Sequence, residues 1–228
     1  MTISIQESKS GLRRRIRERL GAMTAQERIA ASAQACARLT KQAHWQNAQS
    51  ILFYASLRGE VDVWPLLEDA LQAGKRVYLP RFVRELGKAA QSMCEKPRSP
   101  VAADVRRRTT GRVLATNPPP HFGGYVACRI TDLSKNIRVG EFGIREPVAD
   151  CAQISLNLLD LILVPGVAFD LHGWRLGRGK GFYDRLLAAV RGFTCGVAFD
   201  EQIVAQIPVE SHDVHVNCIL TPTRWLEL

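Results

Sequence analysis

The residues whose types and spacing most clearly indicate a chemical function lie in one glycine-rich stretch, 164–185. Its sequence is VPGVAFDLHGWRLGRGKGFYDR. Three alternating glycines, Gly177, Gly179 and Gly181, frame Arg178 and Lys180, and the pattern predicts a helix directly after them. Glycines let backbone N–H groups approach an anion closely, and a helix N-terminus adds partial positive charge. With two full positive charges in the loop, the combination is what a polyphosphate requires.

The loop matches neither of two common phosphate-binding motifs. A Walker A loop requires Ser or Thr after its lysine, whereas Lys180 is followed by Gly181. A Rossmann fingerprint follows its strand at once, but here twelve residues separate Val164 from Gly177. From spacing alone, phosphate binding and a glycine-rich surface turn with solvated charges remain equal alternatives.

Two acidic residues are candidates for holding a metal ion. Asp184 falls in the first turn of the predicted helix, where a carboxylate can hold a Mg²⁺ that bridges phosphate oxygens. Asp213 precedes the last predicted strand, at an edge where the sites of α/β proteins gather. Taken singly, each is better explained structurally, Asp184 as a helix-dipole partner and Asp213 as a turn residue.

The elements that must position these residues follow an α/β pattern. Thr24 and Glu27 form a capping-box sequence, and Asp62 can cap a later helix. A strand, a helix and a strand within 50–80 form a βαβ unit, which favours one α/β domain with a mostly parallel sheet between helix layers. We expect helices at 8–23, 25–40, 62–74 and 182–191, and strands at 50–55, 76–79, 125–130, 158–164, 194–199 and 216–220.

Charge is concentrated in two segments of the 228-residue chain, whose formal net charge is +9. Residues 9–28 and 84–122 carry +5 each, so the remainder is close to neutral. That distribution argues against a nucleic-acid-binding face spread over a folded module. The second segment is rich in proline and arginine with little apolar periodicity, and we interpret it as a flexible insertion.

The remaining composition excludes several classes of protein. No apolar run approaches the roughly 20 residues that span a bilayer, and from the N-terminal residues we expect no secretory signal. The six cysteines form no C-x-x-C pair, so we expect reduced, mostly buried thiols rather than a zinc site or disulfides.

Several motifs together resemble one known family. The stretch 164–185 is very similar to the signature of the 5-formyltetrahydrofolate cyclo-ligase family, also called 5,10-methenyltetrahydrofolate synthetase. In chain order, 9–28 resembles its basic first helix, 59–81 its first βαβ turn, GEFGIREP (140–147) its Gly-Ile-x-Glu-Pro motif, and 208–222 its C-terminal segment. The resemblance implies a single domain over 1–228, with the flexible insertion at about 84–122 outside the likeness.

The fold that the resemblance implies is the three-layer α/β/α type of sugar-isomerase and CoA-transferase-like enzymes. The implied activity is that of an ATP-dependent ligase of folate and one-carbon metabolism, which closes 5-formyltetrahydrofolate to 5,10-methenyltetrahydrofolate and releases ADP and phosphate. ATP as co-substrate and Mg²⁺ are implied with it. We expect a cytoplasmic monomer or weak dimer, with no nucleic-acid partner and no membrane association.

The family's functional residues map onto matching positions here. Lys180 and Arg178 would be catalytic by steadying the transferred phosphoryl group, and Asp184 and Asp213 would serve Mg²⁺. The residues implied for ATP are Lys9, Ser10, Gly11, Leu12, Arg13, Arg175, Leu176, Gly177, Arg178, Gly179, Lys180, Gly181, Phe182 and Tyr183. Those implied for the folate are Ala55, Glu60, Arg178, Gly179, Lys180, Gly181 and Phe182.

Two positions depart from the family pattern. Phe182 stands where the family often has Tyr, and Ala55 replaces a commonly bulkier residue. Two alternative functions stay open: a basic nucleic-acid-binding protein that uses 9–28 and 84–122, and a catalytically silent regulatory member of the same fold. The glycine frame with Lys180, Asp184 and Asp213 argues against the second.

Overall fold

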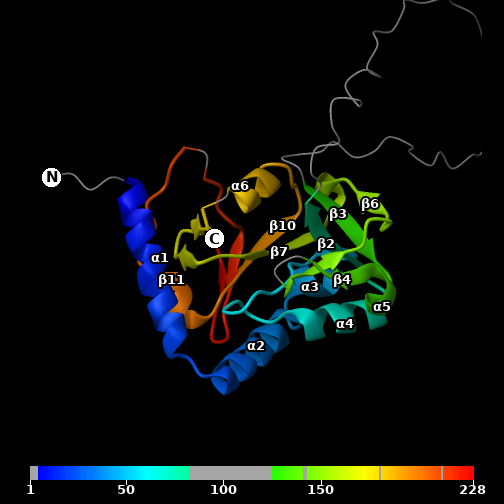
Figure 1. The fold of residues 1–228 in the computed structure, drawn as a ribbon, viewed down its shortest axis with the longest axis horizontal. Helices are drawn as coiled ribbons and strands as arrows, with labels where there is room; N and C mark the ends of the chain where they lie inside the picture. The colour runs from blue at the N-terminus through cyan, green and yellow to red at the C-terminus, as the bar shows by residue number, and fades with distance from the viewer. Residues whose placement is uncertain (1–4, 83–124, 141–142, 180, 212) are drawn as a thin grey trace, which may run out of the picture.

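A computed structural model describes residues 5–82, 125–140, 143–179, 181–211 and 213–228. The predicted insertion at 84–122 and the catalytic candidate Lys180 lie outside these residues. Eight strands form the central sheet, in the order β13-β12-β10-β7-β1-β2-β3-β6 (Figure 1). Their bounds are β13 Trp225–Glu227, β12 Cys218–Leu220, β10 Phe193–Val197, β7 Leu161–Pro165, β1 Ser50–Leu52, β2 Arg76–Phe82, β3 Tyr125–Ile130 and β6 Gln153–Ile154.

The sheet is parallel at its centre and antiparallel at both edges. Strands β12, β10, β7, β1 and β2 run parallel to one another, which confirms the βαβ prediction. Strands β13, β3 and β6 pair antiparallel. Proline at position 80 does not end β2 as predicted, because β1 pairs with β2 only as far as Tyr78. Beyond that point a missing N–H costs little in the ladder.

Helices and turns cover both faces of this sheet. Along β7, Leu161 and Leu163 belong to a core shared with α2, α3 and α4, whereas Ile162 and Val164 belong to a core shared with α6. Alternation along a buried strand sends neighbouring side chains to opposite faces, so the three-layer α/β/α class is confirmed (Figure 1). The helices are α1 Ile5–Ala22, α2 Ala25–Leu39, α3 Ala43–Asn47, α4 Trp64–Gln72, α5 Leu133–Asn136 and α6 Phe182–Leu187.

Local signals at the helix ends were largely correct. Thr24 and Glu27 form the predicted capping box, with the Thr24 backbone N–H donating to Glu27 Oε2 at 2.7 Å. Asp62 lies one residue before the N-cap of α4, yet its Oδ1 still accepts the Trp64 N–H at 3.1 Å. Helix α6 ends at Leu187, earlier than predicted. Further along, at Gly192, the chain passes so close to the Leu159 carbonyl that a Cβ would clash with it.

Besides β2, four predicted strands begin or end differently. The first ends at Leu52 rather than 55, and the strand expected from 158 starts at Leu161 after a 3₁₀ turn, Leu156–Leu158. The strand expected at 194–199 is Phe193–Val197, and the one expected at 216–220 begins at Cys218. Two small sheets complete the fold. One joins β11 Ile203–Val204, β8 Ala168–Asp170 and β9 Arg175–Leu176, and the other joins β4 Ile137–Val139 and β5 Arg145–Pro147.

The cysteines within the described residues are free, as predicted. Four of them are buried and Cys36 is half-buried. Burial raises the pKa of Cys36 and of Cys128 to about 11, which keeps both thiols protonated at neutral pH. The helices in the described ranges are all too short or too polar to cross a membrane.

Candidate active site

The glycine-rich loop is reached through a hairpin that the sequence did not predict. After β7, strands β8 and β9 pair antiparallel, and the hairpin that they form with their turn spans most of the interval between Val164 and Gly177. The buried carboxylate of Asp170 holds the turn, because its Oδ1 accepts the backbone N–H groups of His172 and Trp174 at 3.0 and 3.1 Å. The hairpin delivers Arg175 into the interior and leaves the glycines at the surface of the site.

Arg175 pairs with the first turn of α6 from a buried position. Its Nη2 lies 2.6 Å from Asp184 Oδ1, its side chain is 3% exposed, and its guanidinium stacks over the Tyr183 ring at 5.4 Å. Gly177 makes room for it, since a Cβ there would lie 2.8 Å from Arg175 Nη1. The first glycine of the loop is therefore required by side-chain packing as well as by access for an anion.

The loop is also tied to the segment that follows β1. Arg178 Nη2 donates to Glu60 Oε1 at 2.9 Å, while Glu60 Oε2 accepts the Leu57 backbone N–H at 3.0 Å. The Glu60 side chain is 9% exposed and that of Arg178 is 58% exposed. The structure thus joins a residue implied for the folate to one implied for catalysis, across 118 positions of sequence.

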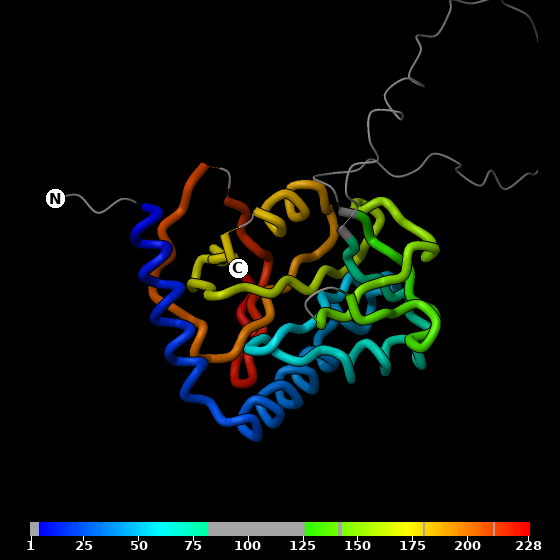
Figure 2. Tube along the Cα trace, in the orientation of Figure 1, coloured from blue at the N-terminus to red at the C-terminus, as the bar shows by residue number. Residues whose placement is uncertain are grey.

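Helix α1 lies beside the loop and the C-terminal segment (Figure 2). Lys9 Nζ lies 2.8 Å from Glu210 Oε2 and 2.7 Å from Asp213 Oδ2. Burial lowers the pKa of Lys9, but hydrogen bonds and charges from the two carboxylates outweigh that effect and leave the pKa raised. Arg13 Nε donates to the Gly177 carbonyl at 2.9 Å, so two of the α1 cations implied for ATP meet the site.

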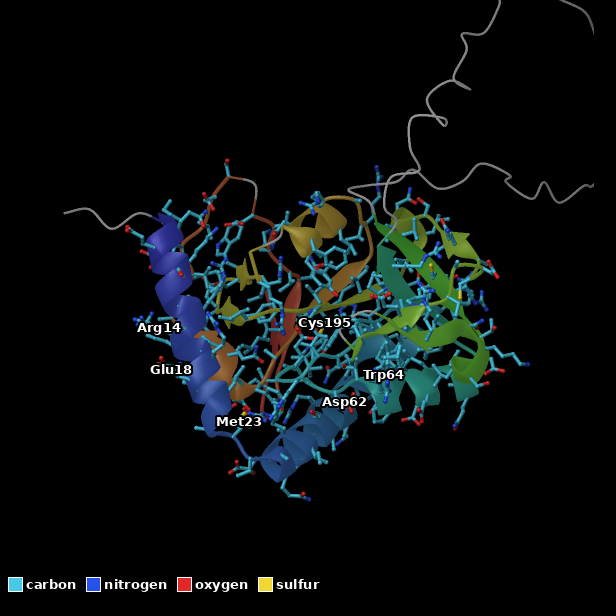
Figure 3. All side chains as sticks on the ribbon, viewed as in Figure 1. Arg14, Glu18, Met23, Asp62, Trp64 and Cys195 are labelled. Atoms are coloured by element: carbon cyan, nitrogen blue, oxygen red, sulfur yellow. The ribbon has the colours of Figure 1, made fainter. Side chains whose placement is uncertain are left out.

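The other α1 residues implied for ATP are placed differently. Ser10 is exposed, and the Leu12 side chain is buried against β8 and β9 with Ile16. Arg14 and Glu18 lie on the side of α1 that faces away from the sheet (Figure 3). Contact through the Leu12 side chain would require the helix to lift from this core.

Half of the predicted site residues line one cavity of about 340 Å³. Ala55 and Glu60 line it from the β1 side, and the loop and α6 contribute Arg175, Gly177, Arg178, Gly181, Phe182, Tyr183 and Asp184. Phe182 and Tyr183 meet edge to face, with ring centroids 4.5 Å apart. The volume and the mixture of aromatic and charged walls suit a small organic ligand.

Sequence reasoning missed four polar or aromatic residues of this wall: Tyr54, Arg81, Arg145 and Glu146. Tyr54 is buried and donates from its hydroxyl to the Val61 carbonyl at 2.8 Å. Arg145 and Glu146 belong to the GEFGIREP motif, which carried the resemblance without an assigned role. The motif was therefore the available signal for two of the four.

The two metal candidates occupy separate ion pairs. Asp184 bonds to Arg175 and Asp213 to Lys9, and the described residues contain no cluster of three or more metal-ligating side chains. Mg²⁺ commonly takes only one or two carboxylates, with phosphate oxygens and water completing its octahedron. The donor chemistry fits Mg²⁺, provided that a bound polyphosphate supplies the remaining ligands.

Comparison with known proteins gives one consistent result. A family model described as the 5-formyltetrahydrofolate cyclo-ligase family matches residues 5–222. The 5-formyltetrahydrofolate cyclo-ligase of Mus musculus is 30% identical over 224 residues, covering 96% of this chain and 95% of its own. The enzyme of Escherichia coli K12 is also 30% identical, over 93% of this chain and 99% of its own.

Solved structures agree with these relatives. The 5,10-methenyltetrahydrofolate synthetase of Aquifex aeolicus has a TM-score of 0.72 at 27% identity, covering 96% of this chain and 92% of its own. The synthetase of Mycoplasma pneumoniae shares the fold, with a TM-score of 0.61 at 17% identity. None of these comparisons supports the nucleic-acid-binding alternative.

Proposed function

Because the chain belongs to the 5-formyltetrahydrofolate cyclo-ligase family, we propose that it closes 5-formyltetrahydrofolate to 5,10-methenyltetrahydrofolate in the cavity beside the glycine-rich loop. It is an ATP-dependent ligase that forms a C–N bond. The observation that carries the assignment to this cavity is the convergence of the loop, Glu60 and the start of α6 on one wall.

The reaction needs little covalent chemistry from the protein. The formyl oxygen takes the γ-phosphoryl group of ATP with release of ADP, N10 then attacks the activated carbon, and phosphate departs with that oxygen. Phosphorylation turns a poor oxygen leaving group into a good one. Positioning of two substrates and neutralisation of phosphate charge are therefore the main tasks of the site.

The nucleotide is assigned to the junction of α1 with the loop. Arg13 already bonds to the Gly177 carbonyl, and a Cβ on Gly179 would lie 3.7 Å from Arg13 Nη2, so this guanidinium sits directly over the loop backbone. Lys180 and Arg178 would steady the transferred group from the loop itself. Arg175 has a different part in this proposal: its buried pair with Asp184 fixes how the loop enters α6.

The formyl end of the folate is assigned to the 340 Å³ cavity next to Arg178. Glu60 holds Arg178 there, and because Arg178 is largely exposed, it can swing from Glu60 toward a phosphoryl group when substrates bind. Phe182 offers its ring face or edge to the folate, without the hydroxyl that a tyrosine would bring.

Asp184 and Asp213 would hold Mg²⁺ once ATP supplies phosphate oxygens. Mg²⁺ held there would supply positive charge that neutralises the phosphates. The ion pairs with Arg175 and Lys9 hold these two carboxylates in fixed positions. We also propose a cytoplasmic location and a monomeric or weakly dimeric state for this enzyme.

The product absorbs near-ultraviolet light, so turnover can be followed directly. Purified protein with 5-formyltetrahydrofolate should show an absorbance rise that requires ATP and is abolished by chelation of divalent cations. Lys180→Ala should eliminate the rise, whereas Arg14→Ala, at an exposed position on the outer side of α1, should not. No ATP-dependent rise with the unmodified protein would refute the proposed function.

A further inference from the structure

Glu146 on β5 is a second carboxylate of the folate cavity, and its side chain packs against the backbone of Gly140. A Cβ placed on Gly140 would lie 2.6 Å from both Cδ and Oε2 of Glu146. The carboxylate is therefore seated on the bare Cα of Gly140. The surrounding hairpin is closed by the Gly140 N–H, which donates to the Ile144 carbonyl at 2.8 Å.

The carboxylates of Glu60 and Glu146 differ in whether protein groups already donate hydrogen bonds to them. Glu60 gives one oxygen to Arg178 and the other to the Leu57 N–H. Glu146 accepts no hydrogen bond and joins no ion pair from any residue in the described ranges, although it lines the same cavity. A ligand that offers two parallel N–H donors thus finds both acceptor oxygens at Glu146.

Arg81 adds a donor to the same wall. It comes from β2, against which β5 packs, and its Nη1 donates to the Val148 carbonyl at 3.4 Å. Its Nε is buried, and its guanidinium also lies within hydrogen-bonding reach of the Cys128 thiol. A thiol is only a weak acceptor, so Arg81 keeps donor capacity that a ligand in the cavity can use.

We propose that Glu146 and Arg81 together recognise the pterin edge of the substrate. The 2-amino-4-oxo ring edge presents two N–H donors beside one carbonyl acceptor. A carboxylate takes such paired N–H donors, and a guanidinium supplies the complementary bond to the carbonyl. The inference rests on the proposed function, and it replaces Glu60 with Glu146 as the carboxylate that reads the ring, leaving Glu60 to position Arg178.

The test measures equilibrium binding of 5-formyltetrahydrofolate without ATP, by quenching of protein fluorescence. Glu146→Gln should weaken binding by about 10- to 100-fold, since a hydrogen-bonded charge is lost at a desolvated edge. Glu68→Gln, at an exposed position on α4, is the matched control and should bind as the unmodified protein does. Gly140→Ala should reproduce the Glu146→Gln loss because its methyl group displaces the carboxylate.

An analogue with a methyl group in place of the 2-amino group makes the test specific for the ring edge. The unmodified protein should bind it about 10- to 100-fold more weakly than the parent, whereas Glu146→Gln should discriminate by less than about 3-fold. If Glu60→Gln removes this discrimination and Glu146→Gln keeps it, Glu60 reads the ring and the inference is wrong. Because the measurement needs no turnover, a failure here is distinct from a failure of the proposed ligase activity.

Discussion

Replacement of Gly177 by alanine tests whether the loop is built around Arg175. The added methyl group would lie 2.8 Å from Nη1 and 3.3 Å from Nη2 of Arg175. An exposed arginine would simply rotate away. This one is 3% exposed and bonded to Asp184 at 2.6 Å, so any movement lengthens a buried charge-assisted bond. The backbone at Gly177 is not left-handed, so the effect is steric.

The size of the effect follows from that displacement. Removing one partner of a fully buried pair costs about 3–5 kcal/mol. Here the guanidinium is displaced rather than removed and Asp184 is 19% exposed, so an overpacking cost of about 1–3 kcal/mol applies. In a chain of this size each kcal/mol lowers Tm by about 2–4 °C. A shift of about 1 Å at the loop should lower kcat/KM by about 100-fold.

Calorimetry and the absorbance assay measure the two effects, and Gly21→Ala is the control for stability. A Cβ on Gly21 meets nothing within 4 Å, and the residue lies in α1, so its Tm should stay constant or rise slightly. In an Asp184→Asn background Gly177→Ala should cost less, because the pair is already weakened. An unchanged Tm and kcat/KM in Gly177→Ala would refute the packing argument.

Three further variants test the surrounding contacts. Lys9→Met should lower the free energy of unfolding by about 1–3 kcal/mol, because two carboxylates lose their cation. Since the pKa of Lys9 is raised, the lysine stays charged from pH 7 to 9, and the Tm difference from the unmodified protein should be constant over that range. Burial opposes ionisation of Asp160, but the N–H and O–H groups of Ser50 outweigh this effect and lower its pKa. Asp160→Asn should therefore have a lower Tm than the unmodified protein at pH 7 in thermal scans. The difference should disappear as the pH falls below about 4, where Asp160 becomes protonated. Tyr54→Phe should lower the denaturant midpoint by the equivalent of about 1–2 kcal/mol, because the buried Val61 carbonyl loses its donor.

Local sequence patterns predicted the elements that depend on nearby residues. The capping box at Thr24, the end of α4 before Gly74 and the parallel β1–β2 unit depend on spacing within one element or between neighbours, and the structure confirms them. Strand β3 was predicted at 125–130, but its antiparallel pairing was not. Strands β6 and β13 and the β8–β9 hairpin were not predicted, since pairing direction and very short strands leave little periodicity to detect.

The candidate site was only partly predictable for a related reason. A glycine frame and cations are local features, but their partners are distant: Arg178 meets Glu60, and Lys9 meets Asp213 across 204 positions. Arg175 looked like a phosphate ligand because its charge is visible in sequence, whereas its burial against Asp184 is not. Side-chain roles set by long-range packing follow from the fold rather than from spacing.

The basic character of the first helix illustrates this limit best. Its excess positive charge suggests an anionic partner along the whole helix, but the helix divides its cations by face. Lys9 and Arg13, one turn apart, point inward beside Leu12 and bond to the C-terminal segment and the glycine loop. Arg14 and Arg15 lie exposed on the opposite side, where charge is solvated. The cations that act on the site are therefore selected by helical periodicity, and net charge alone overstates their number.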